Sequence, residues 1–279
     1  MSLSLEKVAD KVRQLPPIPA VVMEILASSA DESANVSALV RQISCDQALV
    51  SKILYVANSS FYGLSGKIGS IDQAMVVLGF HNLRLLATAA AVMGQFPPGE
   101  SRMFDRHAFW QHSLGVAGCA RVLADRSGVD QKWAFVGGLL HDVGKLVLDI
   151  FFHADFLRVL EYRNDRDCDM LEAEREVLGI DHTTIGYEVA KQCKFPSQIQ
   201  LAIRDHHHPC DAGTAGLADC VHLANVLCHA LDIGHSGYDF VPPPSPQAWQ
   251  RSGLDDSALQ ACLEQIGKAS ARDPIQATI

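Results

Sequence analysis

Histidine is the residue type in this sequence with the clearest potential for chemistry. All of the twelve histidines except His81 lie at position 107 or later. Histidine changes its charge near neutral pH, and its neutral imidazole is the commonest metal ligand in proteins. The uneven distribution therefore predicts that the chemistry of the chain lies in its second part.

The segment His141–Lys145, with the sequence HDVGK, is the most informative motif. Adjacent His141 and Asp142 cannot share one face of a helix, but both can reach one metal if the helix ends there. Gly144 would permit the change in backbone direction. Taken alone, the motif also fits an ordinary helix end, with His and Lys near the negative end of the helix dipole.

Four further histidines could belong to the same site. His112 is expected inside a helix and facing the core, His182 near a helix start, and His206 and His207 at a helix end. The next residue, His208, is expected to face solvent. Imidazoles and one carboxylate brought from separate helix ends form a suitable donor set for a divalent metal. We therefore favour one metal-type pocket over a set of unrelated structural histidines.

The elements that would position these residues are helices, because the hydrophobic periodicity is helical almost everywhere. Capping boxes at Ser44–Gln47 and Ser70–Gln73 each predict a helix start, and Gly79 is placed to end the second helix. Strands do not alternate with helices and no G-x-G-x-x-G motif occurs, which disfavours nucleotide-binding α/β folds. The expected fold class is all-α, in two packed helical halves. Further helices are expected over residues 4–15, 21–27, 82–96, 104–126, 131–141, 156–163, 170–178, 183–193, 196–208, 217–231 and 255–267. Residues 146–152 are expected to be helical or extended.

Proline-rich segments predict the domain organisation. The clearest boundary is Pro97-Pro98-Gly99, and the stretch Pro242–Pro246 is typical of a loop or linker. We expect an N-terminal helical half over residues 1–98 and a second helical half, carrying the His/Asp cluster, over residues 99–235. Residues 236–279 are expected to form a proline-rich loop and a C-terminal helical tail.

Composition excludes several classes of protein. Of the 279 residues, 48% are hydrophobic and 20% charged, which is typical of a folded globular chain. The net charge of −9 argues against binding to nucleic acid or to an anionic membrane. The N-terminus does not resemble a secretory signal, and the eight cysteines form no C-x-x-C pair. These features predict a cytoplasmic protein with reduced cysteines.

The order of the motifs resembles the HD superfamily of metal-dependent phosphohydrolases, which includes the HD-GYP cyclic-dinucleotide phosphodiesterases. The surrounding segments are closer to the HDOD branch of that superfamily, and the resemblance extends over about residues 10–232. It rests on Leu15–Pro19, Asp46–Leu49, Asn58–Ser59, Ser70–Ala74, Leu78–Gly79, Phe109–Ser113, Ala134–Asp142 and His206–His207.

The resemblance implies an all-α HDOD domain, which is chiefly known as a bacterial signalling and regulatory output module. It also implies a divalent metal such as Fe, Mn, Zn or Ni, and a lysine, Lys145, that contacts phosphate. In an enzyme of this type, Asp142 and Lys145 would be the catalytic residues. The implied metal ligands are His112, His141, Asp142, His182, His206 and His207.

Three departures from the superfamily pattern bear on catalysis. The closing aspartate is replaced by Asn225, a glutamate that precedes the first histidine in the HD-GYP branch is replaced by Ala108, and the GYP loop is absent. Asp219 lies on the same predicted helix as Asn225 but would point elsewhere. Fewer carboxylates leave a metal site more positive, so we expect weaker metal binding and less reliable formation of hydroxide.

Two functions follow from these residues. The favoured one is a non-catalytic signalling module with a degenerate metal pocket, because the closing carboxylate is missing. The alternative is a metal-dependent phosphohydrolase acting on a nucleotide or cyclic dinucleotide, because nearly every imidazole is retained. The expected partner is a signalling protein or a small phosphorylated ligand, with no nucleic acid and no membrane, and a homodimer stays open.

Overall fold

The described part of the chain is helical. The computed structural model describes residues 2–15, 40–41, 43–44, 47–58, 68–94, 96, 103–210, 215–233 and 240–270, and these ranges contain helices and no strand. The predicted all-α class is thereby confirmed. The helices are α1 (Leu5–Val12), α4 (Gln47–Ala57), α5 (Ile71–Gly94), α6 (Arg106–Ser127), α7 (Gln131–Leu140), α8 (Val143–Phe151), α9 (His153–Arg166), α10 (Met170–Leu178), α11 (His182–Gln192), α12 (Ser197–Asp205), α13 (Leu217–Ala230), α14 (Pro246–Ser252) and α15 (Asp256–Ser270).

The contacts divide the chain into two compact units. The larger unit comprises Met1–Leu15 and Phe96–Leu259, and the smaller one comprises Pro16–Gln95 and Gln260–Ile279. The N-terminal segment belongs to the larger unit because α1 packs on α11 and the Leu3 N–H donates to the Leu178 carbonyl at 2.7 Å. The domain boundaries expected at 98/99 and 235/236 stay a prediction. The contacts place Met1–Leu15 in the larger unit and Gln260–Ile279 in the smaller one.

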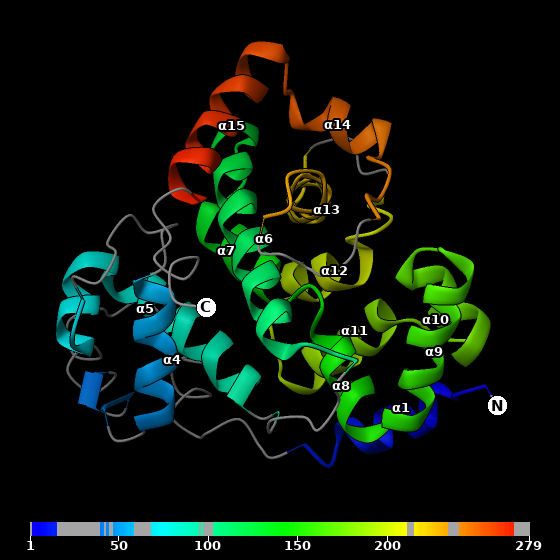
Figure 1. The fold of residues 1–279 in the computed structure, drawn as a ribbon. Coiled ribbons are helices and arrows are strands. Elements are labelled where there is room, and N and C mark those ends of the chain that lie inside the picture. Colours follow the sequence, from blue (N-terminus) through cyan, green and yellow to red (C-terminus); the bar gives the residue numbers. More distant parts are fainter. Residues whose placement is uncertain are drawn as a thin grey trace. The chain divides into compact units, whose positions relative to one another are not determined.

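The larger unit is built around α6, α7 and α13. Helices α6 and α7 lie side by side, and α13 packs against both of them (Figure 1). The faces that meet carry fully buried apolar side chains, among them Val116, Leu123, Leu140 and Val221. Full burial of such a side chain stabilises the fold by about 1.5–3 kcal/mol relative to leaving it exposed. Around this centre, α11 contacts α8 and α12, α12 contacts α13, and α10 contacts α9.

Local signals in the sequence set the helix ends of the larger unit. Asp105 caps α6 by accepting from the His107 and Ala108 N–H groups, at 2.8 and 3.1 Å. Asp181 caps α11 by accepting from the Thr184 N–H at 3.0 Å. These carboxylates satisfy amides that have no partner within the helix. At the other end of α6, Gly128 adopts the left-handed conformation that terminates a helix.

In the smaller unit, the described residues include α4 and α5, which pack against each other. The predicted helix start at Ser70 is confirmed, since the Gln73 N–H donates to Ser70 Oγ. The second bond of the capping box is shifted by one residue, because the Gln73 side chain accepts from the Gly69 N–H and not from the Ser70 N–H. Gly79 interrupts α5 with a positive φ of 76°. This break confirms the sequence expectation that one helix ends at Gly79 and another follows.

Some expectations differ from the structure or lie outside it. Helix α8 begins at Val143, directly after Asp142, whereas regular structure was expected only from residue 146. Helix α14 was not predicted, because Pro242–Pro246 reads as a loop although Pro246 is the first helical residue. The predicted helix at 21–27 and the segment Pro97–Gly99 lie outside the described residues, as do parts of the Ser44 capping box.

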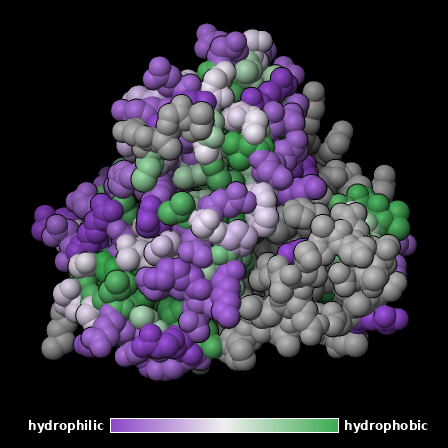
Figure 2. Space-filling view, turned by 180° about the vertical axis from the view of Figure 1, so that it is seen from behind, coloured by the Kyte–Doolittle hydropathy of each residue, from purple (hydrophilic) through white to green (hydrophobic). Residues whose placement is uncertain are grey.

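The described surface carries both polar and apolar side chains, with Val76 the most exposed of the large apolar ones at 84%. On the face drawn in Figure 2, hydrophilic residues cover much of the described surface, and hydrophobic residues lie among them in small groups. Among the described helices, none combines the length and the apolar character needed to cross a membrane.

The close approach of α8 to α11 requires a glycine, which gives a first prediction. A Cβ added at Gly144 would lie 2.0 Å from the carbonyl oxygen of His182, a backbone atom that cannot move away easily. We expect Gly144→Ala to lower the free energy of unfolding by about 1–3 kcal/mol, the usual cost of overpacking. Chemical denaturation monitored by circular dichroism measures the change.

Gly137→Ala is the matched control. A Cβ at Gly137 would lie 3.2 Å from Cγ2 of Val221, which is a side-chain atom. The better helix propensity of alanine, about 1 kcal/mol, offsets a small displacement there. Equal destabilisation by the two substitutions would contradict the assigned contact between Gly144 and the His182 backbone.

Candidate metal centre

The His141–Asp142 pair lies at the junction of two helices in the larger unit. His141 is the C-terminal cap of α7, and α8 starts directly after Asp142, whose backbone angles of −98° and 10° are not helical. The adjacent side chains therefore reach one centre, with His141 Nε2 3.3 Å from Asp142 Oδ2. Gly144 contributes by its lack of a side chain, not by an unusual φ, because its φ is not positive.

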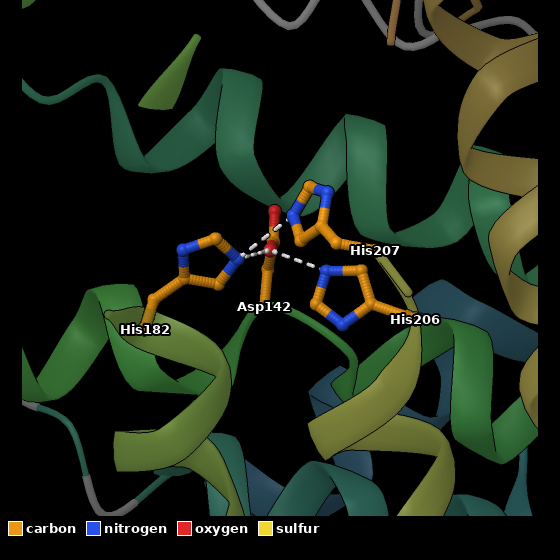
Figure 3. A group of neighbouring side chains, drawn as sticks. All are labelled: Asp142, His182, His206 and His207. Carbon is orange, nitrogen blue, oxygen red and sulfur yellow. Dashed lines mark hydrogen bonds and ion pairs between the residues drawn. The ribbon is translucent and has the colours of Figure 1, made fainter. Parts of the chain in front are cut away.

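Three further imidazoles approach Asp142 from the ends of α11 and α12 (Figure 3). His182 is the first residue of α11, and its Nε2 lies 3.1 Å from Asp142 Oδ1. His206 follows α12, and its Nε2 lies 3.6 Å from the same oxygen. His207 Nε2 lies 3.2 Å from His182 Nε2. All four side chains point toward a common centre.

A fifth imidazole approaches from the middle of α6. His112 is 3% exposed, as expected for a residue facing the core. Its Nε2 lies 3.0 Å from Oδ1 of Asn225 on α13, so Asn225 reaches the cluster as the sequence predicted. Asp219 points elsewhere: it accepts a two-pronged interaction from Arg251 and a hydrogen bond from the Gly216 N–H.

The donor atoms form two overlapping groups that share Asp142. In each group the donor atoms all lie within 4.8 Å of one another, close enough for one cation. His141 Nε2 and His206 Nε2 are buried and have no hydrogen-bond partner among the described residues. Buried polar atoms are rarely left unsatisfied, and divalent cations in the two groups would satisfy both nitrogens. The groups are His112, His141 and Asp142, and Asp142, His182, His206 and His207.

Hydrogen bonds behind the imidazoles fix the direction of their free nitrogens. His141 Nδ1 donates to the Gly138 carbonyl at 2.7 Å, and His206 Nδ1 donates to the Ile203 carbonyl at 2.9 Å. Each bond leaves Nε2 as the nitrogen that faces the centre. Such outer partners orient metal-binding histidines and raise the basicity of the ring.

Sequence reasoning missed Glu174, which plays the same part for His182. Glu174 lies on α10, is fully buried, and its Oε2 accepts from both the N–H and the Nδ1 of His182, at 2.8 and 2.6 Å. The one available signal was its place on the apolar stripe of α10, between Met170 and Leu178 at spacings of four. A glutamate there is unusual unless it has a buried partner.

The charges of the centre are strongly coupled. Burial disfavours the Asp142 carboxylate, but neighbouring His141 and Lys145 outweigh that cost and hold the pKa of Asp142 well below its usual range. Burial would lower the pKa of His182, yet the Glu174 carboxylate raises it to about 9. Burial and neighbouring histidines keep the pKa of His206 and of His207 well below the usual value.

A cavity of about 790 Å³ opens onto the centre. Lys145, His207, Asn225 and His229 all line it, and Lys145 Nζ lies 2.6 Å from Asp142 Oδ2. His229, which the sequence analysis did not single out, stacks near His112 with ring centroids 4.7 Å apart, and burial lowers its pKa to about 4. A cationic lysine beside the metal-type centre suits an anionic group such as phosphate.

The remaining histidines have other places. His208 is exposed, as predicted. His153 lies away from the cluster, with Nδ1 3.2 Å from the Asp149 carbonyl. The side chain of His81 and the whole of His235 lie outside the described residues. Convergence of the six predicted ligands is therefore confirmed, whereas their binding of a metal stays a prediction.

Comparison with known families shows which family the chain belongs to. The HDOD domain family matches residues 15–209, more than half of the chain. The chain belongs to the HDOD family. The match ends directly after the paired histidines, so the Asn225 helix and all that follows lie beyond it.

Two crystal structures share the fold. An HDOD domain protein of unknown function from Geobacter sulfurreducens has a TM-score of 0.74 and 24% identity, covering 96% of this chain and 97% of its own. A presumed phosphohydrolase from Shewanella amazonensis SB2B has a TM-score of 0.72 and 27% identity, covering 95% and 97%.

The curated relatives are longer proteins. An uncharacterized protein of Treponema pallidum is 25% identical over 240 residues, which are 84% of this chain and 46% of the relative. Ribonuclease Y of Acetivibrio thermocellus is 32% identical over 119 residues, which are 43% of this chain and 17% of the relative. The HDOD chain thus spans less than half the length of either relative.

The Glu174–His182 bond gives a prediction about metal affinity. We expect Glu174→Gln to weaken the binding of Mn²⁺ about tenfold, because a neutral amide orients the imidazole but no longer strengthens its basicity. Equilibrium dialysis with elemental analysis measures the affinity. Glu161→Gln, at an exposed position on α9, is the control and should leave it unchanged.

Protonation of His182 gives a second prediction. Its pKa of about 9 means that the metal-free protein carries a proton on His182 at pH 7, whereas a metal ligand must be deprotonated. Metal binding at pH 7 should therefore release about one proton, and the apparent affinity should rise with pH until about pH 9. Titration calorimetry in buffers of different ionisation enthalpy counts the protons, and a count of zero would contradict the assignment.

Proposed function

We propose that this HDOD chain is a signal-transduction module whose pocket binds divalent metal and a phosphate-bearing small ligand without turning the ligand over. The observation that carries the proposal is the place of Asn225. Its neutral amide lies 3.0 Å from His112, at the position where the superfamily pattern has a carboxylate. His112, His141 and Asp142 would hold one ion, and Asp142 with His182, His206 and His207 a second.

Charge balance supports ligand binding. Asp142 is the one carboxylate among the candidate ligands, and a single negative charge does not neutralise even one divalent ion. Lys145 adds a further positive charge at the cavity. A phosphate group supplies the missing negative charge and fits the hard, positive character of such a site.

The signal requires a second component. By the family resemblance, the ligand-bound domain would act on a partner signalling protein, or on a second copy of itself in a homodimer. The net charge of −9 makes nucleic acid and anionic membranes poor partners. A cytoplasmic location is part of this proposal.

A metal-dependent phosphohydrolase is the second candidate, favoured by the carboxylate that both ligand groups share. A bridging carboxylate between two metals is typical of centres that activate water for attack on a phosphate ester, which is the chemistry that bound metal would supply. Asp142 would anchor the metals and Lys145 would hold the phosphate. The names of the Shewanella amazonensis phosphohydrolase and of ribonuclease Y also favour hydrolysis of a phosphate ester.

Turnover separates the two candidates. Protein loaded with Mn²⁺, Fe²⁺ or Ni²⁺ is incubated with bis(p-nitrophenyl) phosphate, and released nitrophenol is measured. We expect wild type and Asp142→Ala to be equally inactive above background. Turnover by wild type that is lost in Asp142→Ala would establish the hydrolase in place of the non-catalytic module.

A substitution at Asn225 tests the observation that carries the proposal. Asn225→Asp has nearly the same shape and restores one negative charge beside His112 and the His141–Asp142 pair. We expect affinity for Mn²⁺ to rise about tenfold, because ligand charge count sets the affinity of hard cations. Asn164→Asp, the same chemical change at an exposed position on α9, is the control. Unchanged metal affinity in Asn225→Asp would contradict the role given to the amide.

A further inference from the structure

The segment Phe240–Gln247, here called the proline strap, lies beyond the HDOD match and forms a wall of the cavity at the metal-type centre. Its lining residues share that cavity with Lys145, His207 and Asn225. The exception in the segment is Val241, which is 44% exposed and does not line the cavity. The strap residues that line it are Phe240, Pro242, Pro243, Pro244, Ser245, Pro246 and Gln247.

A single imidazole ties the strap to the centre. The Ser245 N–H donates to His222 Nε2 at 2.8 Å, and His222 Nδ1 donates to the His206 carbonyl at 2.8 Å. The two bonds use both ring nitrogens and fix the tautomer of a side chain that is 3% exposed. His222 therefore connects the backbone of the strap to the backbone of His206, a candidate metal ligand.

Helix α14 anchors the far end of the strap. Arg251 on α14 forms a two-pronged ion pair with the buried Asp219 of α13, at 3.1 and 2.7 Å. Ser245 caps α14 by accepting from the Ala248 N–H at 3.2 Å. Two-pronged pairs of this kind restrict geometry more strongly than single contacts do.

The composition of the strap makes it a stiff wall. Pro242, Pro243, Pro244 and Pro246 each have a fixed φ, and each proline restricts the residue before it. A wall that is already ordered loses little entropy when a ligand packs against it. The strap is thus suited to contact a ligand and poorly suited to a large closing movement.

The strap adds apolar surface to a cavity whose other walls are largely polar. Lys145, His207 and Asn225 line it from the centre, and charged residues of α9 and α10 line it as well: Arg163, Glu172, Arg175 and Glu176. Ligand sites typically combine an apolar wall with a few placed polar groups. Lys145 fits a phosphate, and the proline rings and Phe240 of the strap fit a flat apolar group attached to it.

We propose that the proline strap is a specificity wall that selects phosphate-bearing ligands with an apolar ring at their other end. The inference rests on the proposed function, since it takes the phosphate to bind at Lys145 and the metals. The strap contacts the ring, and the donor set of the centre binds the phosphate. Residues outside the HDOD match would thereby set which ligand the module senses.

Two phosphonates of equal charge test the inference. Phenylphosphonate carries a ring and methylphosphonate does not, and neither has a P–O–C bond that a hydrolase could cleave. Titration calorimetry of the Mn²⁺-loaded full chain gives both affinities. We expect wild type to bind phenylphosphonate about tenfold more tightly, because the ring leaves water for an apolar wall.

Variants of the strap locate that preference. Phe240→Ala and the double variant Pro243→Gly/Pro244→Gly should each reduce the phenyl preference at least about threefold, with methylphosphonate affinity unchanged. Val241→Ala is the matched control, one residue from Phe240 but outside the cavity lining, and should keep the preference. Circular dichroism verifies that each variant is folded.

The outcomes distinguish failure of the specificity wall from failure of the proposed function. If methylphosphonate binds but phenylphosphonate binds no more tightly, or if the strap variants keep the full preference, the specificity wall is wrong and the proposed function stands. If neither phosphonate binds the metal-loaded protein, the proposed ligand binding itself is wrong and the inference is rejected with it.

Discussion

The buried carboxylate of Asp142 is the group around which the larger unit is organised. It is 2% exposed, and a charge removed from water is costly unless other groups compensate it. Lys145 Nζ at 2.6 Å and His182 Nε2 at 3.1 Å provide part of that compensation. A divalent ion between the same side chains would provide it more fully. The helices that end at the centre therefore bring together the groups that compensate the buried charge of Asp142.

The helix ends also orient the imidazoles toward Asp142. The last carbonyls of a helix have no partner within it, and His141 and His206 each donate Nδ1 to the carbonyl three residues earlier. One hydrogen bond thus caps the helix and aims the other ring nitrogen at the centre. Because the device is local, a histidine directly after a helix acquires the orientation of a metal ligand from its own chain segment.

This local logic explains what the sequence could predict. The six candidate ligands were predictable because each lies at a helix end or on a buried face that its own neighbours define. Glu174 was not, since its partner His182 lies on another helix and an isolated glutamate on α10 resembles a surface residue. The position of the strap at the cavity was not predictable either, because it depends on His222 and Arg251 contacts that no local pattern encodes.

The amide of Asn225 changes the charge of the centre and leaves its shape almost unaltered. The amide oxygen still accepts from His112, so the donor atoms keep their places while one negative charge is lost. With metal bound, the centre would carry an excess of positive charge that attracts a phosphate already in the ground state, and uniform binding tightens a complex without accelerating its reaction. Strong binding of an unreacted ligand is a property that a sensor needs. The amide at position 225 is therefore the feature of the centre that favours the proposed recognition of a ligand over its turnover.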